Sequence, residues 1–111
     1  MQLTTETFGR VTVIHTPDEL TSETAADFLL AIDDLMTQGH IDLVLEMDRS
    51  EVYDSEGLTA LLDLQDHLHE RGGDVKISGL ADPGRKIFEL TRLNQRFDIF
   101  ESVIDAVASF R

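Results

Sequence analysis

A chain of 111 residues suits one ordinary domain, and folding at this length buries roughly two thirds of the unfolded surface. The 22 acidic residues outnumber the 9 basic ones, so the formal net charge of −13 repels phosphate backbones and anionic membranes. The absence of cysteine excludes a disulfide framework and a cysteine-based zinc site. We therefore expect a single domain over residues 1–111 that binds no nucleic acid directly and meets partners through their basic surfaces.

The first part of the chain predicts a hairpin followed by an amphipathic helix. Residues 10–15 alternate branched apolar and polar side chains, which is typical of a strand, and residues 3–7 form its weaker edge partner. Thr21 or Ser22 is placed to cap the helix, and Gly39 ends it. The inward stripe of this helix consists of Ala25, Phe28, Leu29, Ile32, Leu35 and Met36.

The middle of the chain alternates strands and helices. Residues 41–47 have few polar interruptions, which favours a central strand covered on both faces. A helix from about residue 55 to residue 71 and a strand over residues 75–78 follow. This alternation predicts an α/β fold, a mixed and mostly parallel sheet of four to five strands with about four helices packed on it.

Two shorter helices are expected near the end of the chain. Pro83 suits the first turn of a helix that runs to about residue 91, with Ile87 and Leu90 facing inward. Phe97, Ile99 and Phe100 supply apolar anchors after it. The last helix begins at Ser102, and its buried side consists of Val103, Ile104, Val107 and Phe110.

Ser55 lies between two acids where the central strand region gives way to the second helix. Unpaired backbone N–H groups and the positive end of the helix dipole gather there, and both favour a negatively charged group. Serine and aspartate are also common residues at the N-cap of a helix, so Ser55 or Asp54 can serve there without any further function. Local sequence does not separate a modified serine from a cap.

Five short motifs occur in a characteristic order along nearly the whole chain. They are Glu19-Leu20 before Thr24-Ala25, Asp42-Leu43-Val44-Leu45, Asp54-Ser55-x-Gly57-Leu58, Arg71-Gly72-Gly73, and Glu89-Leu90-Thr91-x-Leu93. Together with the order of elements, this set resembles a STAS domain of the anti-sigma-factor antagonist family.

The resemblance implies a non-enzymatic regulatory module that needs no cofactor and no metal. By position, Ser55 corresponds to the serine that a partner kinase phosphorylates, and Asp54 to the aspartate that orients the site. The unmodified protein would bind a switch kinase that acts as an anti-sigma factor, phosphorylation would weaken that binding, and a PP2C-like phosphatase would reset the cycle. The expected partner-binding residues are Glu19, Thr21, Asp54, Ser55, Glu56 and Gly57.

The chain departs from the family pattern at two of these positions. Glu56 stands where the family often has a second small hydroxyl residue, and its charge repels an incoming phosphate donor. Thr21 stands where the family tends to have an acid, in the run Asp18-Glu19-Leu20-Thr21. The first departure bears on phosphorylation, and the second on the choice of partner.

Other classes of protein remain as alternatives. A STAS scaffold or an accessory subunit of a transport ATPase would use Ser55 only as a cap. A small enzyme or a receiver-like phosphotransfer protein would use Asp54 or another acid. A hydrolase with Ser55 as its nucleophile would need a positioned base, and no histidine lies near Ser55 in sequence. His67 and His69 lack the i, i+4 spacing of a helical metal pair.

Because no apolar run approaches the ~18 residues of a membrane span, we expect a cytoplasmic protein without membrane insertion.

Overall fold

The computed structural model describes residues 1–110, which form a mixed α/β fold built around a five-stranded sheet. The strand order in this sheet is β1-β2-β4-β6-β7, and only the pairing of β1 with β2 is antiparallel. Its strands are β1 (Thr4–Phe8), β2 (Val11–His15), β4 (Asp42–Glu46), β6 (Asp74–Ser78) and β7 (Ile99–Phe100). The predicted mostly parallel sheet is confirmed.

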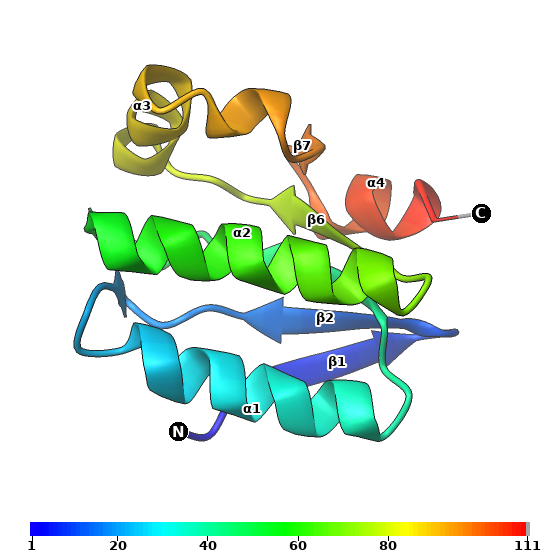
Figure 1. Ribbon diagram of the computed structural model, residues 1–111. Helices are drawn as coiled ribbons and strands as arrows, with labels where there is room; N and C mark the ends of the chain where they lie inside the picture. Colours follow the sequence, from blue (N-terminus) through cyan, green and yellow to red (C-terminus); the bar gives the residue numbers. More distant parts are fainter. Residues whose placement is uncertain (111) are drawn as a thin grey trace.

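Helices cover both faces of this sheet. Figure 1 shows α1 and α2 side by side across one face. The other face receives α4, which contacts β4, β6 and β7. The helices are α1 (Ala25–Thr37), α2 (Ser55–Glu70), α3 (Asp82–Leu90), the short 3-10 helix η1 (Leu93–Gln95) and α4 (Val103–Ala108).

The central strand β4 contributes to two apolar clusters, one on each face of the sheet. Leu43 and Leu45 belong to the large cluster under α1 and α2, whereas Val44 packs with Ala106 of α4. Side chains of a strand alternate between its faces, so an unbroken apolar run is what a doubly covered strand requires. The prediction of a central strand from this run is confirmed.

A second, two-stranded sheet was not expected from the sequence. It pairs β3 (Glu19–Leu20) with β5 (Val52–Tyr53) in parallel, so the segments that precede α1 and α2 lie side by side. The backbone N–H of Glu51 also donates to the Asp18 carbonyl at 3.0 Å. Strands of two residues are too short to show a period of two, which is why the pattern of side chains did not reveal them.

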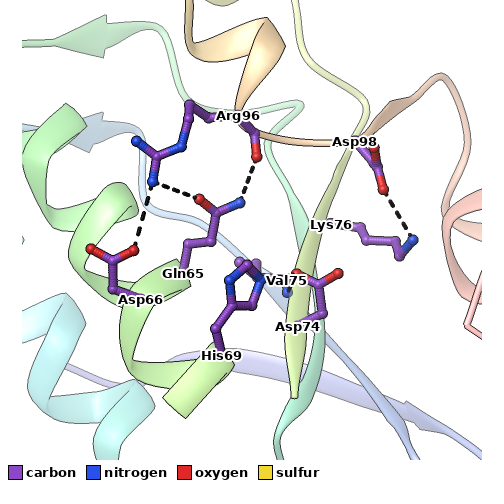
Figure 2. Close-up of polar contacts among 8 residues, drawn as sticks. All are labelled: Gln65, Asp66, His69, Asp74, Val75, Lys76, Arg96 and Asp98. Atoms are coloured by element: carbon purple, nitrogen blue, oxygen red, sulfur yellow. Dashed lines mark hydrogen bonds and ion pairs between the residues drawn. The ribbon is translucent and has the colours of Figure 1, made fainter. Parts of the chain in front are cut away.

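Polar contacts hold α2 against η1 and β6 (Figure 2). The buried Gln65 side chain donates to the Arg96 carbonyl at 2.6 Å and accepts from the Arg96 guanidinium at 3.2 Å, and this guanidinium lies 3.6 Å from Asp66. Near the end of α2, His69 Nε2 lies 2.9 Å from Asp74 Oδ1. These contacts fix the position of α2, and with it the position of its first turn.

Three details of the predicted helices were wrong. Leu90 and Ile104 are each 78% exposed, and the buried apolar side chains on the two helices are those of Phe88 and Ala106 instead. A helix turns about 100° per residue, so Leu90 lies on the opposite side of α3 from Phe88. The N-cap of α1 is Thr24 rather than Thr21 or Ser22, because residues 21–24 form a turn in which the Thr24 N–H donates to the Thr21 carbonyl at 3.0 Å.

Candidate functional site

Asp54 caps α2 and connects it to the segment before α1. Its Oδ1 accepts a hydrogen bond from the Gly57 backbone N–H at 2.9 Å, which is the usual arrangement of an N-cap aspartate. Its Oδ2 accepts from the Ser22 backbone N–H at 2.8 Å. The hydrogen bond from Gly57, followed by the one from Ser22, lowers the pKa of the Asp54 carboxyl below its ordinary value. Asp54 is therefore ionised at neutral pH and held from two sides.

Gly57 lies where the first turn of α2 meets the backbone of β3. A Cβ atom at this position would lie 1.7 Å from the Leu20 carbonyl oxygen, so no larger residue fits without a shift of backbone. The same carbonyl accepts a hydrogen bond from the Asp54 N–H at 3.2 Å. Gly57 is buried, and the backbone that comes close to it is that of Leu20 in the same chain, not that of a partner.

Ser55 and Glu56 are exposed in the first turn of α2. The Ser55 carbonyl accepts a hydrogen bond from the Thr59 hydroxyl at 2.8 Å, whereas the Ser55 hydroxyl has no hydrogen-bond partner within residues 1–110. A free hydroxyl at a helix start is open to an incoming electrophile, and the helix dipole there favours added negative charge. Chemically, this position is suited to accept a phosphoryl group.

The segment from Glu19 to Thr21 lies beside this helix start through the β3–β5 pairing and the Ser22–Asp54 hydrogen bond. Glu19 is exposed, and its carbonyl accepts a hydrogen bond from the Thr24 hydroxyl at 2.8 Å. Thr21 is half-buried, and its hydroxyl accepts from the Glu23 N–H at 3.3 Å. The predicted partner-binding residues Glu19 and Thr21 thus lie on the same side of the molecule as Ser55 and Glu56, whereas Gly57 is buried beneath them.

Tyr53 and Ser22 also belong to this site, although the sequence had not assigned them to it. The Tyr53 hydroxyl donates to the Ser50 carbonyl at 3.1 Å, and burial raises the pKa of Tyr53 to about 12. The hydrogen bond from Ser22 to Asp54 Oδ2 at 2.8 Å uses the backbone N–H, which any residue except proline possesses. A backbone contact of this kind cannot be predicted from the type of residue at position 22. Tyr53 stands directly before the Asp54 motif, and this position could have pointed to its place in the site.

The described part of the chain holds no group of three or more His, Asp or Glu side chains arranged to bind a metal ion. Three histidines have partners elsewhere: His15 pairs with Glu6, His69 with Asp74, and His40 with the Thr12 hydroxyl. Over residues 1–110, no helix is long and apolar enough to cross a membrane.

The fold is that of a small α/β domain with an exposed serine at a helix start, and comparison with known proteins identifies the family. The STAS domain model matches residues 2–106, so the chain belongs to the STAS domain family. No protein among those with curated descriptions matches the sequence.

Several solved structures share this fold. A proposed anti-sigma factor antagonist of Thermotoga maritima superposes with a TM-score of 0.88 at 18% identity, over 96% of this chain and 92% of that one. The Bacillus cell fate determinant SpoIIAA, in its phosphorylated form, gives 0.74 at 20% identity, over 99% and 100% of the two chains. A sulfate transporter family protein of Wolinella succinogenes gives 0.78 at 21% identity, over 91% and 84%. At these identities the likeness shows the fold alone.

Proposed function

We propose that this chain is a non-enzymatic, cytoplasmic binding module that acts as an anti-sigma-factor antagonist and is switched by phosphorylation of Ser55. The single observation that carries the proposal is the exposed Ser55 hydroxyl, free of partners among the described residues, at the start of α2. Asp54 holds the helix start in place from the neighbouring position. The likeness to a phosphorylated form of SpoIIAA supports the same proposal.

The electrostatics of this site are consistent with a switch. Phosphorylation adds about −1.5 to −2 charges and three acceptor oxygens at pH 7. The start of α2 tolerates that charge, so the domain keeps its fold. A docked partner loses affinity when a charge in the interface is left desolvated or meets a like charge. Each ~1.4 kcal/mol of that cost raises the dissociation constant tenfold. A local modification of Ser55 would thus release a switch kinase that also acts as the anti-sigma factor, and a PP2C-like phosphatase would restore binding.

The first experiment identifies the partner and the acceptor together. Ser55→Ala and Ser55→Asp proteins are used as baits, and a kinase captured by the alanine form but not by the aspartate form is the expected partner. That kinase is then incubated with ATP and either the native chain or Ser55→Ala, and phosphate is located by mass spectrometry. Thr5→Ala is the matched control, because Thr5 is exposed on the edge strand β1 and its hydroxyl forms no hydrogen bond within residues 1–110. Equal phosphate uptake by native and Ser55→Ala proteins would remove Ser55 from the role.

A second candidate function is a STAS scaffold or an accessory subunit of a transporter. It is favoured by Glu56, an exposed acid beside Ser55 that supplies permanent negative charge to the surface, and by the likeness to a sulfate transporter family protein. In this case Ser55→Asp changes the dissociation constant of the partner complex by less than about twofold. A large loss of affinity in Ser55→Asp would favour the phosphorylation switch instead.

A further inference from the structure

A groove runs between α1 and α2, beginning at Ser55. It consists of two adjoining hollows of about 330 and 170 Å³ that share Leu29 as a common wall. Small side chains, Ala26 and Ala60, leave the first hollow open beside Ser55, and the second is lined by the larger Leu30 and Met36. Leu30 is 66% exposed, which is high for a leucine. The groove therefore has an apolar floor that nothing in the described chain covers.

The two helices that form this groove are strongly anionic. Together α1 and α2 contain seven acidic residues and neither lysine nor arginine. Asp33 on α1 and Glu56 and Asp63 on α2 line the groove, and these three carboxylates form no ion pair within residues 1–110. The groove is thus an apolar channel with unpaired negative charge on both sides.

This combination of an apolar floor and acidic walls selects the chemistry of an occupant. An amphipathic helix binds in such a groove through apolar side chains one turn apart, and lysine or arginine on its flanks would pair with the acids. A second copy of this chain also carries a net charge of −13, and anionic membranes and nucleic acids are repelled in the same way. The charge therefore favours a basic protein segment over these other occupants.

We propose that the groove between α1 and α2 is the docking surface for a basic amphipathic helix of the partner protein. This inference rests on the proposed function for the identity of that partner, and it adds where the partner binds and what chemistry it presents. The groove supplies affinity through Leu29, Ala26 and the three acids, while Ser55 lies at its end, where a kinase must bring the phosphates of its nucleotide. Repulsion between those phosphates and a phosphorylated Ser55 then acts at the end of the groove, where Ser55 lines the first hollow.

The test titrates the ¹⁵N-labelled full chain with a synthetic helical peptide and follows the backbone amides by NMR. The peptide has leucines spaced at i, i+3 and i+7 and lysines on its flanks. The largest shifts are expected on the residues of α1 and α2 that line the groove. Ala26→Tyr, which fills the first hollow from an exposed position, is expected to weaken binding about tenfold or more. Ala31→Tyr makes the same change on α1 in a separate hollow outside the groove, and it is expected to leave binding unchanged.

The matched pair for the charge is Asp33→Lys and Asp34→Lys. Both residues are exposed neighbours on α1 and both substitutions change the net charge equally, but only Asp33 lines the groove, whereas Asp34 lies in a separate hollow with Met1 and Leu3. Asp33→Lys is expected to weaken binding about threefold or more, and Asp34→Lys by less than about twofold.

Three results would overturn the proposal: equal effects of Asp33→Lys and Asp34→Lys, an unchanged affinity in a folded Ala26→Tyr protein, or equal binding of a control peptide in which serine replaces leucine. The first would show general attraction to a negative chain, and the other two would show that the apolar floor takes no part. The titration uses neither kinase nor ATP, so its result is independent of whether Ser55 accepts phosphate.

Discussion

Asp54 Oδ2 accepts a hydrogen bond from the backbone N–H of Ser22 at 2.8 Å, so one carboxylate joins two segments that are 32 residues apart. The same side chain caps α2 through Gly57. Ser22 precedes α1, and Asp54 precedes α2. The relative position of the two helix starts, and of Ser55 between Asp54 and Glu56, therefore depends on the hydrogen bonds of the Asp54 carboxylate.

Replacing Asp54 by asparagine tests this link through its pH dependence. Because hydrogen bonds lower the pKa of Asp54 in the folded chain, its ionisation stabilises the fold above the unfolded pKa of about 4. This stabilisation is lost as the pH falls through the lower folded pKa. We expect Asp54→Asn to be less stable than the native chain at pH 7, and the difference in their free energies of unfolding to narrow as the pH falls below about 4. Urea unfolding at a series of pH values measures this difference. A difference that stays constant down to pH 3 would contradict the link.

The control for this series is Asp48→Asn. Asp48 is exposed and forms no hydrogen bond or ion pair with its side chain in the described part of the chain. Its replacement changes the net charge by the same amount, so the control should leave the pH profile of stability close to the native one.

Gly57→Ala is expected to destabilise the domain by about 1–3 kcal/mol or more, the range for overpacking a tight contact. The added Cβ would lie 1.7 Å from the Leu20 carbonyl, and only movement of backbone relieves that overlap. Gly84→Ala is the matched control: it is also a helical glycine, but its Cβ would meet the ends of the Leu80 and Tyr53 side chains at 2.7 and 2.9 Å. Side-chain ends move more easily than backbone. Urea unfolding curves should show the larger loss for Gly57→Ala, and equal losses would contradict the proposed role of the β3 contact.

Phe88→Ala is expected to lower the free energy of unfolding by about 3–5 kcal/mol, because Phe88 is fully buried. Its ring packs edge-on against Tyr53, with ring centroids 6.5 Å apart, so the substitution also loosens the segment before Asp54. Leu90→Ala on the same helix should change stability by less than about 0.5 kcal/mol, since Leu90 is 78% exposed. Thermal or urea unfolding compares the two. A larger loss for Leu90→Ala would restore the inward orientation that the sequence had suggested.

Glu56→Ala is expected to speed phosphorylation of Ser55 by the partner kinase about twofold to fivefold. The exposed Glu56 carboxylate adjoins Ser55, and two charges about 4 Å apart in water interact by about 1 kcal/mol. Initial rates of phosphate incorporation, measured with the kinase at saturating concentration so that weaker docking in the groove does not lower them, give the measurement. Glu70→Ala removes the same charge from the far end of α2 and should leave the rate unchanged. Similar rates for the native chain and Glu56→Ala would show that Glu56 does not oppose the phosphate donor.

Several features of the fold could be predicted because they depend on neighbours in the sequence. The unbroken apolar run of β4 indicated a strand covered on both faces, and both apolar clusters contain its residues. Asp54 directly before a helical pattern indicated a cap, and its carboxylate does bond the Gly57 N–H. Ser102 likewise accepts a hydrogen bond from the Asp105 N–H at 3.1 Å. In each case the pattern and the contact span only a few residues.

The short helices were harder to predict. In α3, Phe88 and Leu90 are both large and apolar, and nine residues are too few for periodicity to decide which of them faces the core. Packing against Tyr53 and Phe97 decided for Phe88. In α4, Val103, Ala106 and Val107 share the covered side, so Ile104 points away from the sheet.

The sequence by itself determined the type of each long element, the family pattern and the chemistry available at residues 54–57, because helix periods, caps and strand patterns are local. Only the tertiary structure decided what these residues meet. The need for glycine at position 57 comes from the Leu20 carbonyl, and the second contact of Asp54 comes from the Ser22 backbone. The open groove beside Ser55 arises because Ala26 and Ala60 face each other from separate helices. Contacts between distant segments depend on which surfaces pack together, and no short window of sequence contains both sides of such a contact.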